Sequence, residues 1–263
     1  MRHTIAKYMS LCLLMAASIL LMPLEQKGAG YSVLVLGVAS LLFADKQYAR
    51  HMALVFFSLA VLGLTPISTD ISPAHMAIMG ATLSVAVGVP YIIMRYVYKE
   101  RIITYPFGGH TWTRGHIGYL LLAAVLAYLL LPFWMITTNG HLNWTVPLDP
   151  TSITLLFIGT NALGIWDELF FIITVLVILR HHLPFVWANM IQAVLFTAFL
   201  YELGFRGWAP LAIYPFALLQ GIVFKKTHNL VYIIAIHLTI DFVLFLALIN
   251  AHHPHLIDIF ITK

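Results

Sequence analysis

Long apolar runs, separated by short stretches with Pro, Gly and charged residues, constrain most strongly how this chain can fold. Nine runs are recognisable, at approximately residues 8–24, 31–43, 51–64, 74–98, 117–136, 152–179, 184–201, 210–224 and 230–249. A helix of about 20 apolar residues can span a bilayer because all of its backbone hydrogen bonds are satisfied internally. Some of the runs are short for a full crossing. The sequence therefore predicts an all-α, polytopic transmembrane helical bundle of about 8–9 spans.

The composition agrees with a membrane protein and excludes an ordinary soluble domain. Charged residues make up 9% of the chain and hydrophobic residues 61%, whereas soluble domains carry roughly 25% charged residues. No repeat or linker stands out, so we expect one integral membrane domain over residues 1–263, with N-terminal helices in 1–150 and the functional motifs in 151–250. The net charge of +4 is not gathered on a basic face, so we expect membrane lipid and no nucleic acid as its surroundings.

Basic residues separate into two alternating sets of loops, as the positive-inside rule requires of real spans. One set holds Arg2, Lys7, Lys46, Arg50, Arg95, Lys99, Arg101, Arg114, Arg180, Lys225 and Lys226. The other set holds only three basic residues. With nine spans, this asymmetry predicts a cytoplasmic N-terminus and an external C-terminus.

Three of the ten acidic residues, Asp167, Glu168 and Asp241, fall inside the predicted spans. An unpaired charge there costs at least a few kcal/mol, so each acid needs a partner, a proton or an aqueous cavity. His237 precedes Asp241 by four residues and shares its helix face. Counting from the helix ends places Glu168 and Asp241 at similar depth. Asp167 and Glu168 are about 100° apart on a helix, so we expect that both cannot point squarely at one site.

A buried His–Asp pair can also serve only to lock two helices together. Three acids and one histidine that converge in the last four helices favour a functional site over such a structural pair. Asn161, Asn189 and Gln192 are candidate interhelical hydrogen-bonding residues near this site, with helix packing as their ordinary role.

The last hundred or so residues resemble the CAAX-protease and bacteriocin-processing (CPBP, also called Abi) family of intramembrane proteases. The family's Glu-Glu-x-x-x-Arg motif corresponds to the stretch from Asp167-Glu168 to Ile172. Its Phe-x-x-x-His motif corresponds to Phe196 to Leu200, and its His-x-x-x-Asn/Asp motif to His237-Leu-Thr-Ile-Asp241. The third motif is intact, whereas the first has lost its Arg and the second its His.

The resemblance implies an intramembrane endopeptidase that hydrolyses a membrane-associated peptide or protein with a carboxylate-activated water. Its catalytic residues would be Asp167, Glu168, His237 and Asp241. A polar cavity open to the cytoplasm is then expected. Ile172 and Leu200 favour an alternative, a catalytically inactive CPBP-like scaffold that binds other membrane proteins. A third alternative is an ion-coupled transporter, because transporters commonly have buried acids and histidines in their spans.

Glu202 follows directly after Leu200 and is spaced to pair with Arg206 at i,i+4. If its helix bends inward, Glu202 could replace the missing histidine; otherwise it forms an interfacial ion pair. Imidazole and carboxylate groups bind divalent metals well. Glu168, Glu202, His237 and Asp241 would therefore make a ligand set for zinc or another divalent ion.

Overall fold

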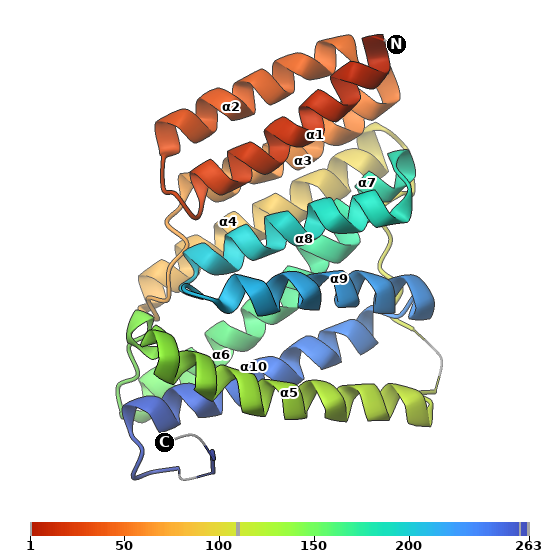
Figure 1. The fold of residues 1–263 in the computed structure, drawn as a ribbon. Coiled ribbons are helices and arrows are strands. Elements are labelled where there is room, and N and C mark those ends of the chain that lie inside the picture. Colours follow the sequence, from red (N-terminus) through yellow and green to blue (C-terminus); the bar gives the residue numbers. More distant parts are fainter. Residues whose placement is uncertain (1, 109–110, 258, 262–263) are drawn as a thin grey trace.

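The computed structural model describes residues 2–108, 111–257 and 259–261 and consists of helices joined by short loops (Figure 1). The α-helices are α1 (Arg2–Leu21), α2 (Lys27–Ser40), α3 (Lys46–Leu64), α4 (Pro73–Ile92), α5 (Arg114–Thr138), α6 (Pro150–Asp167), α7 (Val177–His182), α8 (Phe185–Glu202), α9 (Ala209–Thr227) and α10 (Leu230–His252). Two π-helices, η2 (Ile93–Val97) and η4 (Glu168–Leu176), extend α4 and join α6 to α7. Short 3-10 turns, η1 (Leu41–Phe43) and η3 (Gly140–Asn143), follow α2 and α5.

Seven helices in the described ranges are long and apolar enough to cross a membrane: Arg2–Leu21, Lys46–Leu64, Pro73–Val97, Arg114–Thr138, Pro150–His182, Phe185–Glu202 and Leu230–His252. The shorter α2 with η1, and α9, complete a bundle of nine helical rods within the part of the chain that the structure describes. This arrangement confirms the predicted polytopic helical bundle, and the protein is an integral, multi-pass membrane protein.

Polar residues just outside the helices set where several of them begin. Asp45 accepts hydrogen bonds from the backbone N–H groups of Gln47 and Tyr48, at 2.9 and 3.2 Å, and so caps α3. These bonds, with that to Tyr48 first, lower the pKa of Asp45 because they favour its charged form. Asp149 caps α6 in the same way, with Pro150 at the first helical position. The cap at Asp45 lets α3 begin before residue 51, where its apolar run begins.

The helices lie in a stack with the N-terminal helices on one side and the C-terminal helix on the other (Figure 1). The hairpin of α1 and α2 lies beside α3, whereas α10 packs against α5 and α6 on the far side. Between them lie α8, α9 and the rod formed by α6, η4 and α7. Every residue of η4 except Leu169 is buried, so this π-helix forms part of the centre of the bundle.

The two ends of the bundle are held by polar contacts between distant segments. At the end where α1 begins, called here the N-terminal end, His51 Nδ1 lies 2.8 Å from His182 Nε2, and His51 Nε2 lies 2.8 Å from Glu100. His182 is therefore partly buried, although His181-His182 is typical of a solvated turn. At the opposite end, Asn143 donates to the Gly204 carbonyl at 2.6 Å.

Aromatic packing around Trp166 joins the middle helices. The Trp166 ring stacks on Phe170 with centroids 4.9 Å apart and contacts Phe199 on α8 at the same centroid distance. Its indole N–H donates to the Leu83 carbonyl on α4 at 2.8 Å. Trp166 is one residue before Asp167, so this packing also fixes the end of α6 next to the buried acids.

Replacing Trp166 by Phe should keep the ring stacking but remove the hydrogen bond from α6 to α4. Loss of a buried hydrogen bond lowers the free energy of unfolding by about 1–2 kcal/mol, so the melting temperature in detergent should fall. Trp187→Phe is the matched control, because Trp187 is 58% exposed and its indole N–H donates to no described residue. Equal melting temperatures for the two variants would contradict this account of the core.

Candidate functional site

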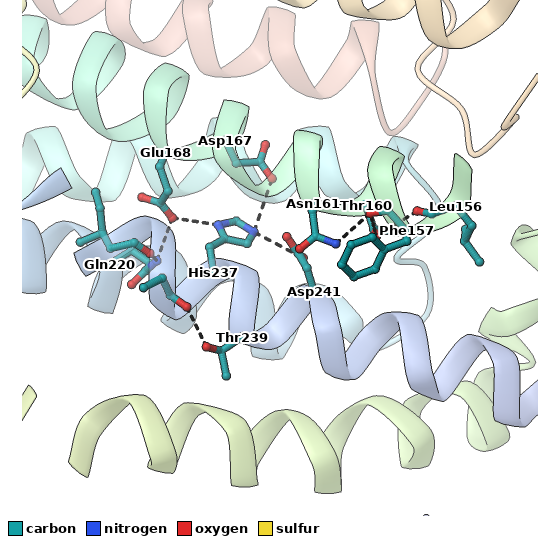
Figure 2. Close-up of polar contacts among 12 residues, drawn as sticks. Leu156, Phe157, Thr160, Asn161, Asp167, Glu168, Gln220, His237, Thr239 and Asp241 are labelled. Atoms are coloured by element: carbon teal, nitrogen blue, oxygen red, sulfur yellow. Dashed lines mark hydrogen bonds and ion pairs between the residues drawn. The ribbon is translucent and has the colours of Figure 1, made fainter. Parts of the chain in front are cut away.

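The buried polar cluster is centred on the imidazole of His237, which projects from α10 toward α6 (Figure 2). Its Nδ1 lies 2.8 Å from Glu168 Oε1. Its Nε2 lies 3.6 Å from Asp167 Oδ2 and 3.9 Å from Asp241 Oδ1. The structure therefore brings all four predicted catalytic residues around one ring, with one acid at Nδ1 and two at Nε2.

All four side chains are removed from the surface: Asp167 and Glu168 are 2% exposed, His237 4% and Asp241 8%. In the described ranges no Lys or Arg forms an ion pair with them. One atom of each carboxyl group, Asp167 Oδ1, Glu168 Oε2 and Asp241 Oδ2, is buried without a hydrogen-bond partner among the described residues. In this low-dielectric interior, the imidazole of His237 is the polar group that all three acids approach.

Asp167 and Glu168 stand where the α-helix α6 changes into the π-helix η4. The wider helical turn is also visible at Thr174, whose hydroxyl donates at 2.9 Å to the carbonyl of Leu169, five residues earlier. Single π-turns within helices are frequent at functional sites. Both acids lie next to the imidazole, but only Asp167 lines the adjoining cavity, so the two do not point squarely at one site, as the helix geometry predicted. The imidazole lies between them and offers a different ring nitrogen to each acid (Figure 2).

Gly164 on α6 makes room for the acid and the imidazole of α10. A Cβ atom at this position would lie 3.1 Å from Asp241 Cγ and 3.1 Å from His237 Cδ2, and would overlap a carboxylate oxygen of Asp241. A larger residue would therefore push α10 away from α6. The glycine allows Asp241 and His237 to lie beside the helix that carries Asp167 and Glu168.

Sequence reasoning missed Gln220, which reaches the cluster from α9 (Figure 2). Its side-chain nitrogen donates to Glu168 Oε1 at 2.7 Å and to the Ile233 carbonyl at 3.3 Å. The sequence feature that could have indicated it is a single side-chain amide within the apolar run at 210–224. Two aromatic rings, Phe196 and Phe216, flank His237 with centroid distances of 6.1 and 5.6 Å.

The other predicted hydrogen-bonding residues hold helices rather than contact the acids. Asn189 and Gln192 on α8 donate to the carbonyls of Leu218 and Ala217 on α9, each at 2.9 Å. Asn161 donates at 2.8 Å to the Phe157 carbonyl of its own helix (Figure 2). The amides of α8 therefore fix the position of α9, the helix that presents Gln220.

A cavity of about 680 Å³ adjoins the cluster and is lined by α4, α5, α6, α8, α9 and α10. Asp167, His237 and Asp241 line it, whereas Glu168 lies on the other edge of the imidazole and does not. Most of the wall consists of apolar side chains, such as Leu126, Ile213 and Leu244. The cavity is thus a mainly apolar chamber, and the cluster residues Asp167, His237 and Asp241 form one part of its wall.

This chamber differs from the expected polar cavity, because its wall is mainly apolar. Its loop residues, Ser68 to Ile71 and Trp144, belong to the end of the bundle opposite the N-terminal end. Leu200, at the position of the missing motif histidine, also lines the chamber. Ile172, at the position of the missing motif arginine, is 2% exposed within η4. Both positions therefore contribute apolar surface instead of hydrogen-bonding groups.

Glu202 lies away from the cluster, at the opposite end of the bundle, where its carboxylate is 3.5 Å from Lys27 of α2. Arg206 pairs instead with Glu25, at 3.3 Å. The predicted i,i+4 pair of Glu202 and Arg206 was wrong, because α8 ends at Glu202 and the chain turns at Gly204, which has a φ of 109°. Glu202 therefore takes the interfacial position, with a partner that is distant in sequence.

The predicted metal ligands are not gathered around one point. Glu202 is paired with Lys27. Glu168 and Asp241 lie next to different nitrogens of the His237 ring, so the ring separates them and one ion could not be bound by both acids and the imidazole. In the ranges that the structure covers, no group of three or more His, Cys, Asp or Glu side chains is arranged to hold a metal ion. The predicted set thus does not fit one divalent ion in this arrangement.

Comparison with known protein families gives a match that covers the region of the cluster. Residues 149–243 match the family model described as Type II CAAX prenyl endopeptidase Rce1-like. No curated protein and no solved structure matches the chain. The matched region begins at the cap of α6 and includes all three motif positions and both carboxylates of the first motif. Residues 149–243 are therefore similar to the Rce1-like type II CAAX prenyl endopeptidases, which confirms the resemblance to the CPBP family.

Proposed function

We propose that this protein is an intramembrane endopeptidase of the CPBP type, which hydrolyses a membrane-associated peptide or protein. The observation that carries the proposal is the two-sided environment of His237. Glu168 contacts Nδ1 on the edge of the ring that is turned away from the cavity. Nε2, Asp167 and Asp241 face the cavity, which is large enough for a substrate segment. An acid that orients an imidazole toward a reacting group is a recurrent arrangement in hydrolases.

In the proposed reaction, a water molecule donates one hydrogen bond to Asp167 Oδ2 and one to His237 Nε2. The distance of 3.6 Å between Asp167 Oδ2 and His237 Nε2 is too long for a good direct hydrogen bond. It allows both atoms to accept hydrogen bonds from the same water molecule. As the water oxygen attacks the scissile carbonyl, Asp167 takes its proton and later passes it to the leaving amine. The products are one carboxylic acid and one amine, so the proton count balances.

The peptide oxygen becomes negatively charged in the tetrahedral intermediate and needs a donor. Asp241 lines the cavity beside Nε2 and, in its protonated form, can donate to this oxygen. No lysine or arginine in the described ranges pairs with the cluster, and Asp241 is the carboxyl group that lies beside Nε2 together with Asp167.

The chamber also bears on the class of substrate. The matched family is named for prenyl endopeptidases, and the walls near the cluster are formed by apolar side chains of α5 and α9. Prenyl groups are attached to cysteine in C-terminal Cys-aliphatic-aliphatic-X sequences. A peptide that carries such a hydrocarbon group is the probe best matched to an apolar chamber with a polar reaction site.

The orientation follows from charge alone. Under the positive-inside rule the N-terminal end, which carries most of the basic residues, faces the cytoplasm and the C-terminus lies outside. Accessibility of single cysteines introduced in the loops on either side of α8 would test this orientation.

Catalysis by the cluster predicts large losses from single substitutions. His237→Ala, Asp167→Asn and Glu168→Gln should each lower kcat for a fluorogenic prenylated peptide by about 10²–10⁴-fold, because a positioned acid or base contributes that much. Thr239→Val on α10 is the control, since the Thr239 hydroxyl donates only to the Ala235 carbonyl of its own helix, at 2.7 Å. Wild-type rates in all three cluster variants would eliminate the site.

The metal content of the same preparations tests the predicted divalent ion. If an ion contributes, wild-type protein should carry it in a stoichiometric amount, and His237→Ala should lose it. Equal metal content in both proteins would show that the ion is not held by the cluster.

The close approach at Gly164 yields a separate prediction. Gly164→Ala should displace Asp241 and His237 and lower kcat by about 10²-fold, the cost of a misplacement of roughly 1 Å. Gly88→Ala is the matched control, because an added Cβ at Gly88 would meet nothing within 4 Å. The idea fails if Gly164→Ala keeps the kcat of Gly88→Ala.

A second candidate function is a catalytically inactive membrane scaffold. The apolar residues Leu200 and Ile172, at positions where the family motifs carry His and Arg, favour it. This candidate predicts that prenylated peptides stay uncleaved, while a membrane protein partner copurifies equally with wild-type protein and with His237→Ala. Cleavage that depends on His237 would exclude it.

A further inference from the structure

Gln220 contacts neither the cavity nor a motif residue other than Glu168, yet it is almost completely buried, with 2% exposure. Its side-chain nitrogen lies 2.7 Å from Glu168 Oε1, the same oxygen that faces His237 Nδ1 at 2.8 Å. One carboxyl oxygen therefore lies between an amide and an imidazole, which come from α9 and α10 (Figure 2).

The orientation of the Gln220 amide is fixed by its second partner. The same nitrogen lies 3.3 Å from the carbonyl oxygen of Ile233, which can only accept a hydrogen bond. If the amide were flipped, two oxygens would face each other at Ile233 and no donor would face Glu168. The group directed at Glu168 Oε1 is therefore an N–H donor.

Gln220 donates to Glu168 Oε1, and a carboxylate oxygen that accepts this bond can accept a second one from the imidazole. His237 Nδ1 is then the donor toward Glu168, so in the neutral ring Nε2 carries the lone pair. Nε2 is the nitrogen that lies beside Asp167 and Asp241 and faces the chamber. The Gln220 amide therefore influences Nε2 indirectly, through its hydrogen bond to Glu168 and the bond between Glu168 and Nδ1.

We propose that Gln220 is a positioning residue, which sets the tautomer of His237 through Glu168 and thereby presents an unprotonated Nε2 to the cavity. The consequence for catalysis rests on the proposed function, because only a hydrolase needs this nitrogen as an acceptor for water. The tautomer assignment itself rests on the contacts of Gln220 with Glu168 and Ile233 and can be tested without a substrate.

The position of Gln220 depends on the packing of α9 against α8. The bonds from Asn189 and Gln192 end at Leu218 and Ala217, on the turn just before Gln220. At Gly221, a Cβ atom would overlap the side-chain oxygen of Asn189, so the two helices are in close contact there. These contacts hold the backbone of α9 and thereby the position of Gln220.

The test is nitrogen NMR of histidine-labelled full-length protein in detergent, with the His237 signals assigned by their loss in His237→Ala. Wild-type protein should show the Nδ1–H tautomer. Gln220→Met, which has a similar shape but no donor, should move the Nδ1 and Nε2 resonances toward each other, because both tautomers become populated. Gln220→Glu, which offers a carboxylate in place of the amide, should have the same effect and serves if the Met variant fails to fold.

Ser58→Ala is the control for effects on stability alone. Ser58 is fully buried, and its hydroxyl donates to the Ala86 carbonyl at 2.7 Å, so it joins α3 to α4 and not α8 to α9. We expect its loss to lower the melting temperature and to leave the His237 resonances in place. In a cleavage assay with the prenylated peptide, Gln220→Met should lower kcat by about 10²-fold with KM unchanged, whereas Ser58→Ala should not.

The two proposals can fail separately. If the His237 resonances stay unchanged in both Gln220 variants while Glu168→Gln moves them, the positioning role of Gln220 is overturned, whatever the cleavage assay shows. If the resonances move as expected but wild-type protein cleaves no peptide, Gln220 still sets the tautomer and only the peptidase proposal fails.

Discussion

A histidine buried among carboxyl groups inside membrane-spanning helices needs defined hydrogen-bonding partners, because the bilayer excludes bulk water. The bond between Glu168 and Nδ1 of His237 fulfils this need on one edge of the ring. It also fixes which edge is turned to the cavity, since the carboxylate and the chamber lie on opposite sides. The arrangement of Asp167 and Asp241 around Nε2 follows from this one contact.

Features of the surrounding helices allow the contact between Glu168 and His237 to form. Gly164 lets α10 approach α6, and the change from α- to π-helix at Glu168 directs two neighbouring acids to two edges of one imidazole. The amides of α8 hold α9 so that Gln220 reaches Glu168. A glycine, a π-helical segment and the interhelical bonds of two side-chain amides thus position the same buried cluster. Each is a local departure from an ordinary apolar transmembrane helix.

The bundle could be predicted because hydrophobic length is a property of each run by itself. The start of α3 could not, since Lys46 and Arg50 interrupt the apolar pattern although Asp45 caps the helix before them. The four cluster residues were found because acids inside predicted spans are rare. Gln220 was missed because an isolated amide has no spacing relation to the motifs. The partner of Glu202 was missed because Lys27 lies far away in sequence. The single-domain organisation and the orientation in the membrane stay predictions.

The apolar walls of the chamber carry a consequence for the supply of one reactant. Hydrolysis consumes a water molecule for every bond broken, but surfaces such as those of Leu126, Ile213 and Leu244 hold water weakly. Under the proposed function, hydration of the chamber would be intermittent, and each turnover would have to wait for a molecule to reach Asp167. The hydrocarbon lining that accommodates an apolar substrate would then also limit the supply of the attacking water.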